Sequence, residues 1–197
     1  TYDYDQARSL IQAALQPLGE SYLHDLFAGL DGGWVDRLEN EGKRSGAYSW
    51  GVYGVHPFVL MSWQDTYDSV STLAHEMGHS MHSFYSSQNQ EYTNSEYTIF
   101  CAEVASTTNE NLLLEYMLNH AAPQDRLYYI NLYLEQIRTT VFRQVLFAEF
   151  EKLTHAAVEQ NEALTADKLE SIWMELNRRY YGEEVILDDE LRAEWSR

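Results

Sequence analysis

The segment at residues 66–85 limits how this chain can fold more than any other feature. Its apolar residues recur at helical spacing, and the stretch HEMGHSMH sets His75, Glu76, His79 and His82 among them. Gly78 lies within this helix, where glycine costs about 1 kcal/mol relative to alanine, so we expect another element to approach closely there. The segment therefore predicts a buried helix that needs partners from elsewhere in the chain.

Helical periodicity also dominates the rest of the sequence. It predicts helices over about 4–16, 20–30, 66–85, a long helix that ends near 118, and further helices over 124–160 and 165–181. Thr93 and Glu96 have capping-box spacing at the start of the long helix, and Thr165 is a candidate N-cap. HPFVLMSW at 56–63 is the one convincing strand. The fold class expected is mainly α, with one small β-sheet or hairpin.

Composition narrows the class of protein. The chain has 197 residues and is 45% apolar, enough for one globular domain over 1–197. A formal charge of −18 would repel a phosphate backbone, so we expect no nucleic-acid partner. Cys101 is the single cysteine, and neither a leader nor a bilayer-length apolar run is evident. The chain is therefore predicted to be cytoplasmic, with no membrane partner. The chain begins on Thr1 rather than methionine and ends without a polar tail, which suggests a piece of a longer polypeptide.

The histidine cluster has metal-ligand spacing. His75 and His79 are four residues apart, so on a helix they lie on one face and can bind the same ion. With Glu76 they form the HExxH pattern, in which two imidazoles bind zinc and the glutamate takes a proton from zinc-activated water. The alternative is a solvated polar face. His82 lies about 10 Å of helix rise beyond His75, too far to share its ion, and is expected to support the site structurally.

A catalytic zinc ion usually has three protein ligands and one open position. The extended motif would need glycine at position 82 and histidine at position 85, where the chain has His82 and Tyr85. The third ligand must therefore come from another element. The next helix offers four candidates for this ligand, Glu96, Glu103, Glu110 and Glu115. We favour Glu103 because its neighbours are apolar or small, and a buried carboxylate needs a partner. A Glu103 that is exposed or paired with arginine remains an alternative. Glu110 could hydrogen-bond a ligand histidine.

Three separate segments carry a family resemblance. HEMGHSMH at 75–82, YTIFCAEVASTTNE at 97–110 and GKRSGAYS at 42–49 together resemble the M3 family of zinc oligopeptidases, and most closely its oligoendopeptidase F branch. The resemblance implies zinc bound by His75, His79 and Glu103, with Glu76 as the general base. It also implies a zincin-type helical metallopeptidase core, in which oligopeptide substrates lie along a short sheet beside the motif helix.

Family members are roughly three times longer than this chain. The resemblance implies that an N-terminal helical part, and a later segment with a histidine and tyrosines that stabilise the transition state, belong to the rest of the same polypeptide. Two rival functions remain at this point. One is an HExxH metallocarboxypeptidase, which would trim single C-terminal residues, and the other is a zinc-binding domain without turnover.

Overall fold

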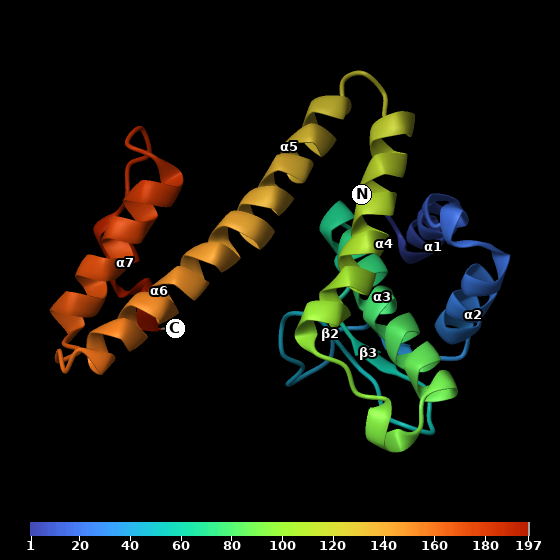
Figure 1. The fold of residues 1–197 in the computed structure, drawn as a ribbon. Coiled ribbons are helices and arrows are strands. Elements are labelled where there is room, and N and C mark those ends of the chain that lie inside the picture. Colours follow the sequence, from blue (N-terminus) through green and yellow to red (C-terminus); the bar gives the residue numbers. More distant parts are fainter. Residues whose placement is uncertain (197) are drawn as a thin grey trace. The chain divides into compact units, whose positions relative to one another are not determined.

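The computed structural model describes residues 1–196 and divides the chain into two compact units, residues 1–129 and 130–197. The first unit contains helices α1 (Tyr4–Ala14), α2 (Glu20–Asp31), α3 (Tyr67–Asn89) and α4 (Ile99–His120), and strands β1 (Val35–Asp36), β2 (Tyr48–Trp50) and β3 (Phe58–Leu60). Helix α5 (Arg126–Ile137) begins in the first unit and ends in the second. The second unit continues with a π-helix (Arg138–Phe142), α6 (Arg143–Glu159), α7 (Ala166–Tyr181) and a 3₁₀ segment (Asp189–Ser196). Figure 1 shows these elements.

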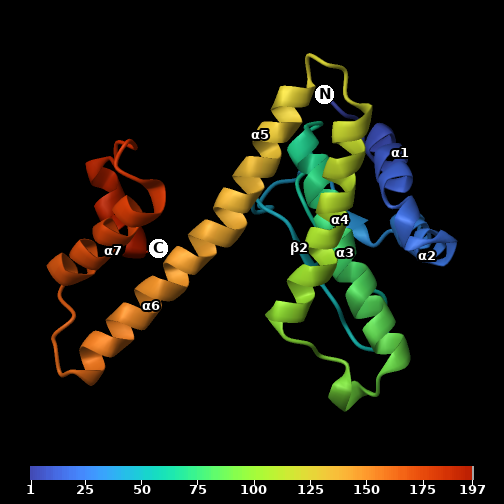
Figure 2. The ribbon, with the colours of Figure 1, turned by 45° about the horizontal axis from the view of Figure 1, so that its top comes forward.

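Helices α3 and α4 form the centre of the first unit. They run antiparallel and side by side in both views (Figures 1 and 2). They approach each other closely at Gly78, where an added Cβ would lie 2.7 Å from Ser106 Cα and 2.9 Å from the Ala105 carbonyl oxygen. The expectation of a close approach at Gly78 is confirmed. Asn109 strengthens the same contact, because its buried side chain donates to the Ala74 carbonyl at 3.0 Å.

The sheet has the order β1-β3-β2, so β2 is an edge strand. Strand β3 pairs in parallel with β1 and antiparallel with β2. Sequence patterns indicated only the strand around β3, because Phe58–Leu60 lies within the apolar run at 56–63, whereas β1 and β2, with two and three residues, lie in no such run. The mainly α fold with one small sheet is confirmed.

The second unit has its own core. Trp173 of α7 is 1% exposed, stacks on Phe147 of α6, and donates its indole N–H to the Leu191 carbonyl. Leu146 and Leu176 are buried beside it. This unit is stabilised by contacts between α6, α7 and the C-terminal 3₁₀ segment.

Helix boundaries differ from prediction at two places. Thr93 and Glu96 do not cap α4; residues 92–94 form a 3₁₀ turn, and α4 begins only at Ile99, after Thr98. The Ser86 hydroxyl donates to the Ser95 carbonyl and holds this segment against α3, so a tertiary contact outweighs the local signal. The helix predicted over 124–160 contains the π-helix between α5 and α6. Thr165 is confirmed as the N-cap of α7, since its hydroxyl accepts from Lys168 N. No helix within residues 1–196 is long and apolar enough to cross a membrane.

Candidate metal centre

Three of the predicted site residues meet between α3 and α4. His75 and His79 lie one turn apart on α3, and Glu103 comes from the second turn of α4. One ligand atom from each lies within 4.8 Å of the other two. The two Nε2 atoms are 3.1 Å apart, and each is 3.6 Å from Glu103 Oε2. The helix pair therefore presents two imidazole nitrogens and a carboxylate oxygen to one point.

The spacing of these atoms fits a zinc ion. A triangle with sides of 3.1, 3.6 and 3.6 Å has a circumradius of about 2.0 Å, and zinc bonds to His nitrogen and carboxylate oxygen are about 2.0–2.2 Å long. Two nitrogens and one oxygen are also a common donor set for catalytic zinc, which keeps its fourth position open. The residues present therefore fit the ion without rearrangement.

Neighbouring groups contact each of the three candidate metal-binding side chains. His75 Nδ1 lies 3.0 Å from Glu110 Oε2, and the Ser71 hydroxyl donates to the other oxygen of Glu110. A proton held on Nδ1 by that carboxylate leaves the Nε2 lone pair free for a metal. The Ser106 hydroxyl donates to Glu103 Oε2 at 2.8 Å, and the His79 ring hydrogen-bonds the Ala102 backbone carbonyl. The predicted contact of Glu110 with a ligand histidine is present.

Glu76 is buried next to this group, at 7% exposure. Burial raises the pKa of its carboxyl above the usual range, and the neighbouring His75 and a hydrogen bond from the Ser49 backbone partly offset that rise. A carboxylate with a raised pKa is a stronger base, which suits a group that must take a proton from water near neutral pH. The arrangement places a base on α3 beside the two histidines of the potential metal site.

His75 and His79 have opposite pKa shifts. Burial by itself would lower the pKa of His75, but the hydrogen bond to Glu110 and the charges of Glu110, Glu76 and Glu103 outweigh burial and raise it. For His79, burial and the neighbouring His75 lower the pKa. Three carboxylates around two imidazoles thus make the site strongly attractive for a cation.

Two predictions about neighbouring residues have different outcomes. The prediction that apolar neighbours bury Glu103 is wrong. Its side chain is 48% exposed, and Ile99, Phe100 and Val104 are also exposed. Its position opposite the histidines comes from α4 packing on α3, not from a buried environment. His82 is not among the three converging residues. Its ring stacks on Tyr97 at 3.7 Å, as expected for a structural role.

Sequence reasoning missed Ser106, Ser71 and the backbone of Ser49. Ser106 lies three residues after Glu103 and Ser71 four residues before His75, so helical spacing could have placed both beside the ligands. Ser49 is 27 residues before Glu76 and belongs to a three-residue strand, so no local pattern in the sequence connects it to the site.

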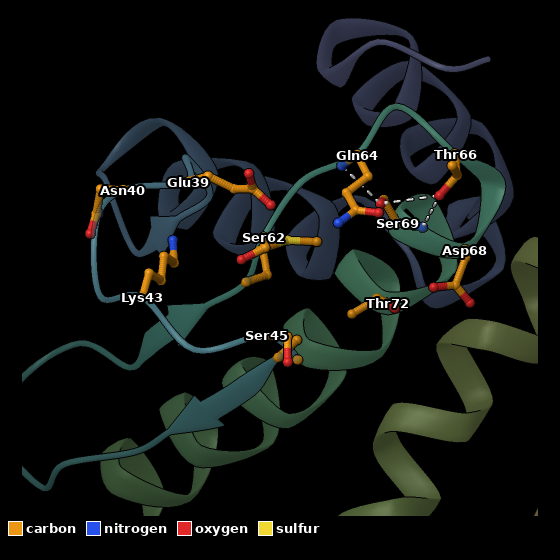
Figure 3. Close-up of a pocket in the computed structure, with 13 residues that line it drawn as sticks. Glu39, Asn40, Lys43, Ser45, Ser62, Gln64, Thr66, Asp68, Ser69 and Thr72 are labelled. Carbon is orange, nitrogen blue, oxygen red and sulfur yellow. Dashed lines mark hydrogen bonds between the residues drawn. The ribbon is translucent and has the colours of Figure 1, made fainter.

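A polar cavity of about 380 Å³ lies near the N-terminal end of α3 (Figure 3). Lys43, Gln64, Asp68 and Thr72 are among its lining residues, and none of the predicted site residues lines it. Lys43 is mostly buried and donates to Asp36 and to the Leu38 carbonyl. Its ammonium group therefore holds the loop before β2 in place.

Comparison with known proteins decides the family. The model of peptidase family M3 matches residues 19–196. The chain belongs to peptidase family M3. Among its M3 relatives, oligopeptidase PepF of Bacillus subtilis is 48% identical over 98% of this chain and 29% of its own. The chromosomal oligoendopeptidase F of Lactococcus lactis subsp. cremoris is 43% identical over 100% of this chain and 33% of its own.

A solved structure agrees with this assignment. A Chlamydophila abortus protein described as a peptidase superposes with a TM-score of 0.82 at 43% identity, over 99% of this chain and 33% of its own. The chain thus spans about a third of the length of these M3 relatives. The predicted family and the zincin-type helical fold are confirmed.

Proposed function

We propose that residues 1–197 form the zinc-binding catalytic core of an M3 oligopeptidase, in which His75, His79 and Glu103 hold the ion and Glu76 is the general base. The observation that carries this proposal is the convergence of the three ligand atoms at zinc-binding spacing. The names of the M3 relatives, all bacterial oligopeptidases or oligoendopeptidases, support an oligopeptide substrate. The rest of the same polypeptide would complete the active site.

A bound zinc ion would polarise the peptide carbonyl and acidify a water molecule. Glu76 would accept a proton from the water whose oxygen attacks the carbonyl carbon, and would later donate it to the amine that leaves when the C–N bond breaks. The hydrogen bond from the Ser49 backbone favours the charged form of this carboxylate by lowering its pKa. Glu110 and Ser106 hold His75 and Glu103 so that their donor atoms keep facing the same point.

We propose that the peptide substrate binds along the edge of β2 that does not pair with β3. Val59 and Met61 donate their backbone N–H groups to β1, at Trp34 and Asp36, so the polar groups of Phe58 and Leu60 face β2. Ser49, opposite Val59, therefore directs its N–H and C=O away from β3. Its N–H bonds Glu76, and an extended peptide could pair with the remaining edge groups by strand addition.

Glu76→Gln tests the catalytic role. In the protein at its full natural length, we expect zinc content near one per chain and loss of oligopeptide hydrolysis by at least about 100-fold, since general-base catalysis supplies about 10²–10⁴. Zinc is measured by elemental analysis and hydrolysis with an internally quenched peptide. Glu115→Gln, at an exposed position of α4, is the matched control and should keep both properties.

Other outcomes would contradict the proposal. Undiminished turnover by the Glu76→Gln protein would remove Glu76 from the mechanism. Bound zinc with no cleavage of any peptide would indicate a zinc-binding domain. Cleavage that requires a free C-terminus, and stops when the peptide is amidated, would indicate a carboxypeptidase.

A further inference from the structure

The three converging residues His75, His79 and Glu103 are here called the metal group. A second cavity of about 510 Å³ opens directly beside this group and shares His79 with it. Its walls come from four places: the end of β2 and the turn after it, the C-terminal half of α3, residues 92–97 before α4, and Ala102 on α4 itself. Trp50, Tyr53, Tyr92, Glu96 and Tyr97 contribute side chains. A peptide that lies along the β2 edge with its cleaved bond at the metal group would place a neighbouring side chain in this cavity, here called the Trp50 pocket.

The walls of the Trp50 pocket are held by specific contacts. An added Cβ at Gly51 would lie 2.5 Å from Ser83 Cβ, so the turn after β2 rests directly on α3. The Tyr97 ring stacks on His82, and its hydroxyl hydrogen-bonds Ser83. Tyr53 donates to the Gln90 carbonyl at 3.1 Å. The pocket is therefore preorganised, which lowers the entropic cost of binding a side chain.

The chemistry of the walls favours one kind of side chain. Trp50, Tyr53 and Tyr92 are 67%, 41% and 71% exposed, so their rings are open to a ligand. Glu96 adds an exposed carboxylate, and among residues 1–196 neither a lysine nor an arginine lines the pocket. Aromatic faces attract a guanidinium or ammonium group, a carboxylate pairs with it, and the apolar stem of Arg or Lys packs on the rings.

We propose that the Trp50 pocket is a specificity subsite that selects an arginine or lysine side chain next to the cleaved peptide bond. This inference rests on the proposed peptidase function, because it needs a peptide bound across the metal group. The Glu96 carboxylate pairs with the positive charge of this side chain, and Trp50 and Tyr92 provide the aromatic surfaces on which it stacks. The net charge of −18 acts in the same direction by attracting basic peptides.

The test compares three quenched peptides that differ at one residue beside the cleaved bond: arginine, its neutral isostere citrulline, or glutamate. With the protein at its full natural length, we expect kcat/KM for the arginine peptide to exceed that for citrulline by about 5- to 10-fold, and the glutamate peptide to be poorest. Product mapping by mass spectrometry identifies the side of the bond that carries the preference.

Glu96→Gln should reduce the ratio between arginine and citrulline to about one, whereas Glu91→Gln, an exposed carboxylate on the same segment but outside the pocket lining, should leave it unchanged. Trp50→Ala should weaken binding of the arginine peptide, measured as Kd in a Glu76→Gln background. Equal kcat/KM for the three peptides, or a preference untouched by Glu96→Gln, would overturn the subsite while leaving the peptidase intact. Failure to cleave any of them would instead contradict the proposed function.

Discussion

At the residue scale, the three candidate metal-binding side chains are held in place by groups that are not themselves among the converging residues. Ser106 is fully buried and donates to Glu103, although Glu103 itself is half-exposed. An exposed carboxylate on a helix would ordinarily sample several rotamers, so the Ser106 hydroxyl restricts it to the orientation that faces His75 and His79. Glu110 has the same effect on His75.

Ser106→Ala should therefore weaken zinc binding without removing a ligand. We expect an increase in the zinc Kd of about 10- to 100-fold, the usual effect of losing a partner that orients a metal ligand. Competition with a chelating dye measures the Kd. Thr108→Ala, whose hydroxyl bonds the Val104 carbonyl on the exposed side of α4, is the control. Identical affinities for the two variants would show that Ser106 does not position Glu103.

At the element scale, the site depends on how closely α3 and α4 pack. The three donor atoms belong to two helices, and the 3.6 Å separations between Glu103 Oε2 and the two histidine Nε2 atoms hold only while the helix axes keep their distance. Gly78 sets that distance, because its missing side chain leaves room for the Ser106 backbone. A residue with poor intrinsic helix propensity is thus required by the packing of its helix.

Gly78→Ala should destabilise the protein and disturb the site together. Alanine favours a helix by about 1 kcal/mol, but its Cβ would lie 2.7 Å from Ser106 Cα, and overpacking of this kind costs about 1–3 kcal/mol. Chemical denaturation and zinc content measure the two effects. Gln88→Ala, exposed on the same helix, should change stability by less than about 0.5 kcal/mol. Unchanged stability and zinc content in Gly78→Ala would refute the close-packing role.

At the scale of the whole molecule, the chain contains two units with separate cores. All of the residues that form the metal group and the Trp50 pocket belong to residues 1–129. The second unit is organised around Trp173, which contacts α6 and the C-terminal 3₁₀ segment. The prediction of one catalytic core over 1–197, and that of a cytoplasmic location, both remain predictions.

Trp173→Ala should act mainly on the second unit. Loss of a buried tryptophan costs about 3–5 kcal/mol, so backbone hydrogen exchange should accelerate in α7 while α3 and α4 keep their protection and zinc stays bound. Hydrogen-exchange mass spectrometry with elemental analysis would measure both. Equal loss of protection in α3 would show instead that the two units unfold as one cooperative body.

Local spacing along the sequence was enough to predict several parts of this protein. HExxH on a helix places His75 and His79 on one face, and Gly78 within that helix indicated a close neighbour, because helical geometry alone fixes which residues share a face. Composition and periodicity likewise predicted the helical fold. The three quoted segments also indicated the family.

How elements that are far apart in the sequence meet became clear from the tertiary structure alone. Apolar neighbours suggested Glu103 for the wrong reason, since it is half-exposed and reaches the histidines through the packing of α4 on α3. The roles of Ser106 and Ser49, the free edge of β2 and the Trp50 pocket had no signal in local sequence. Each depends on distances between elements that are separated along the chain, and those distances are set by side-chain packing, which residue spacing does not encode.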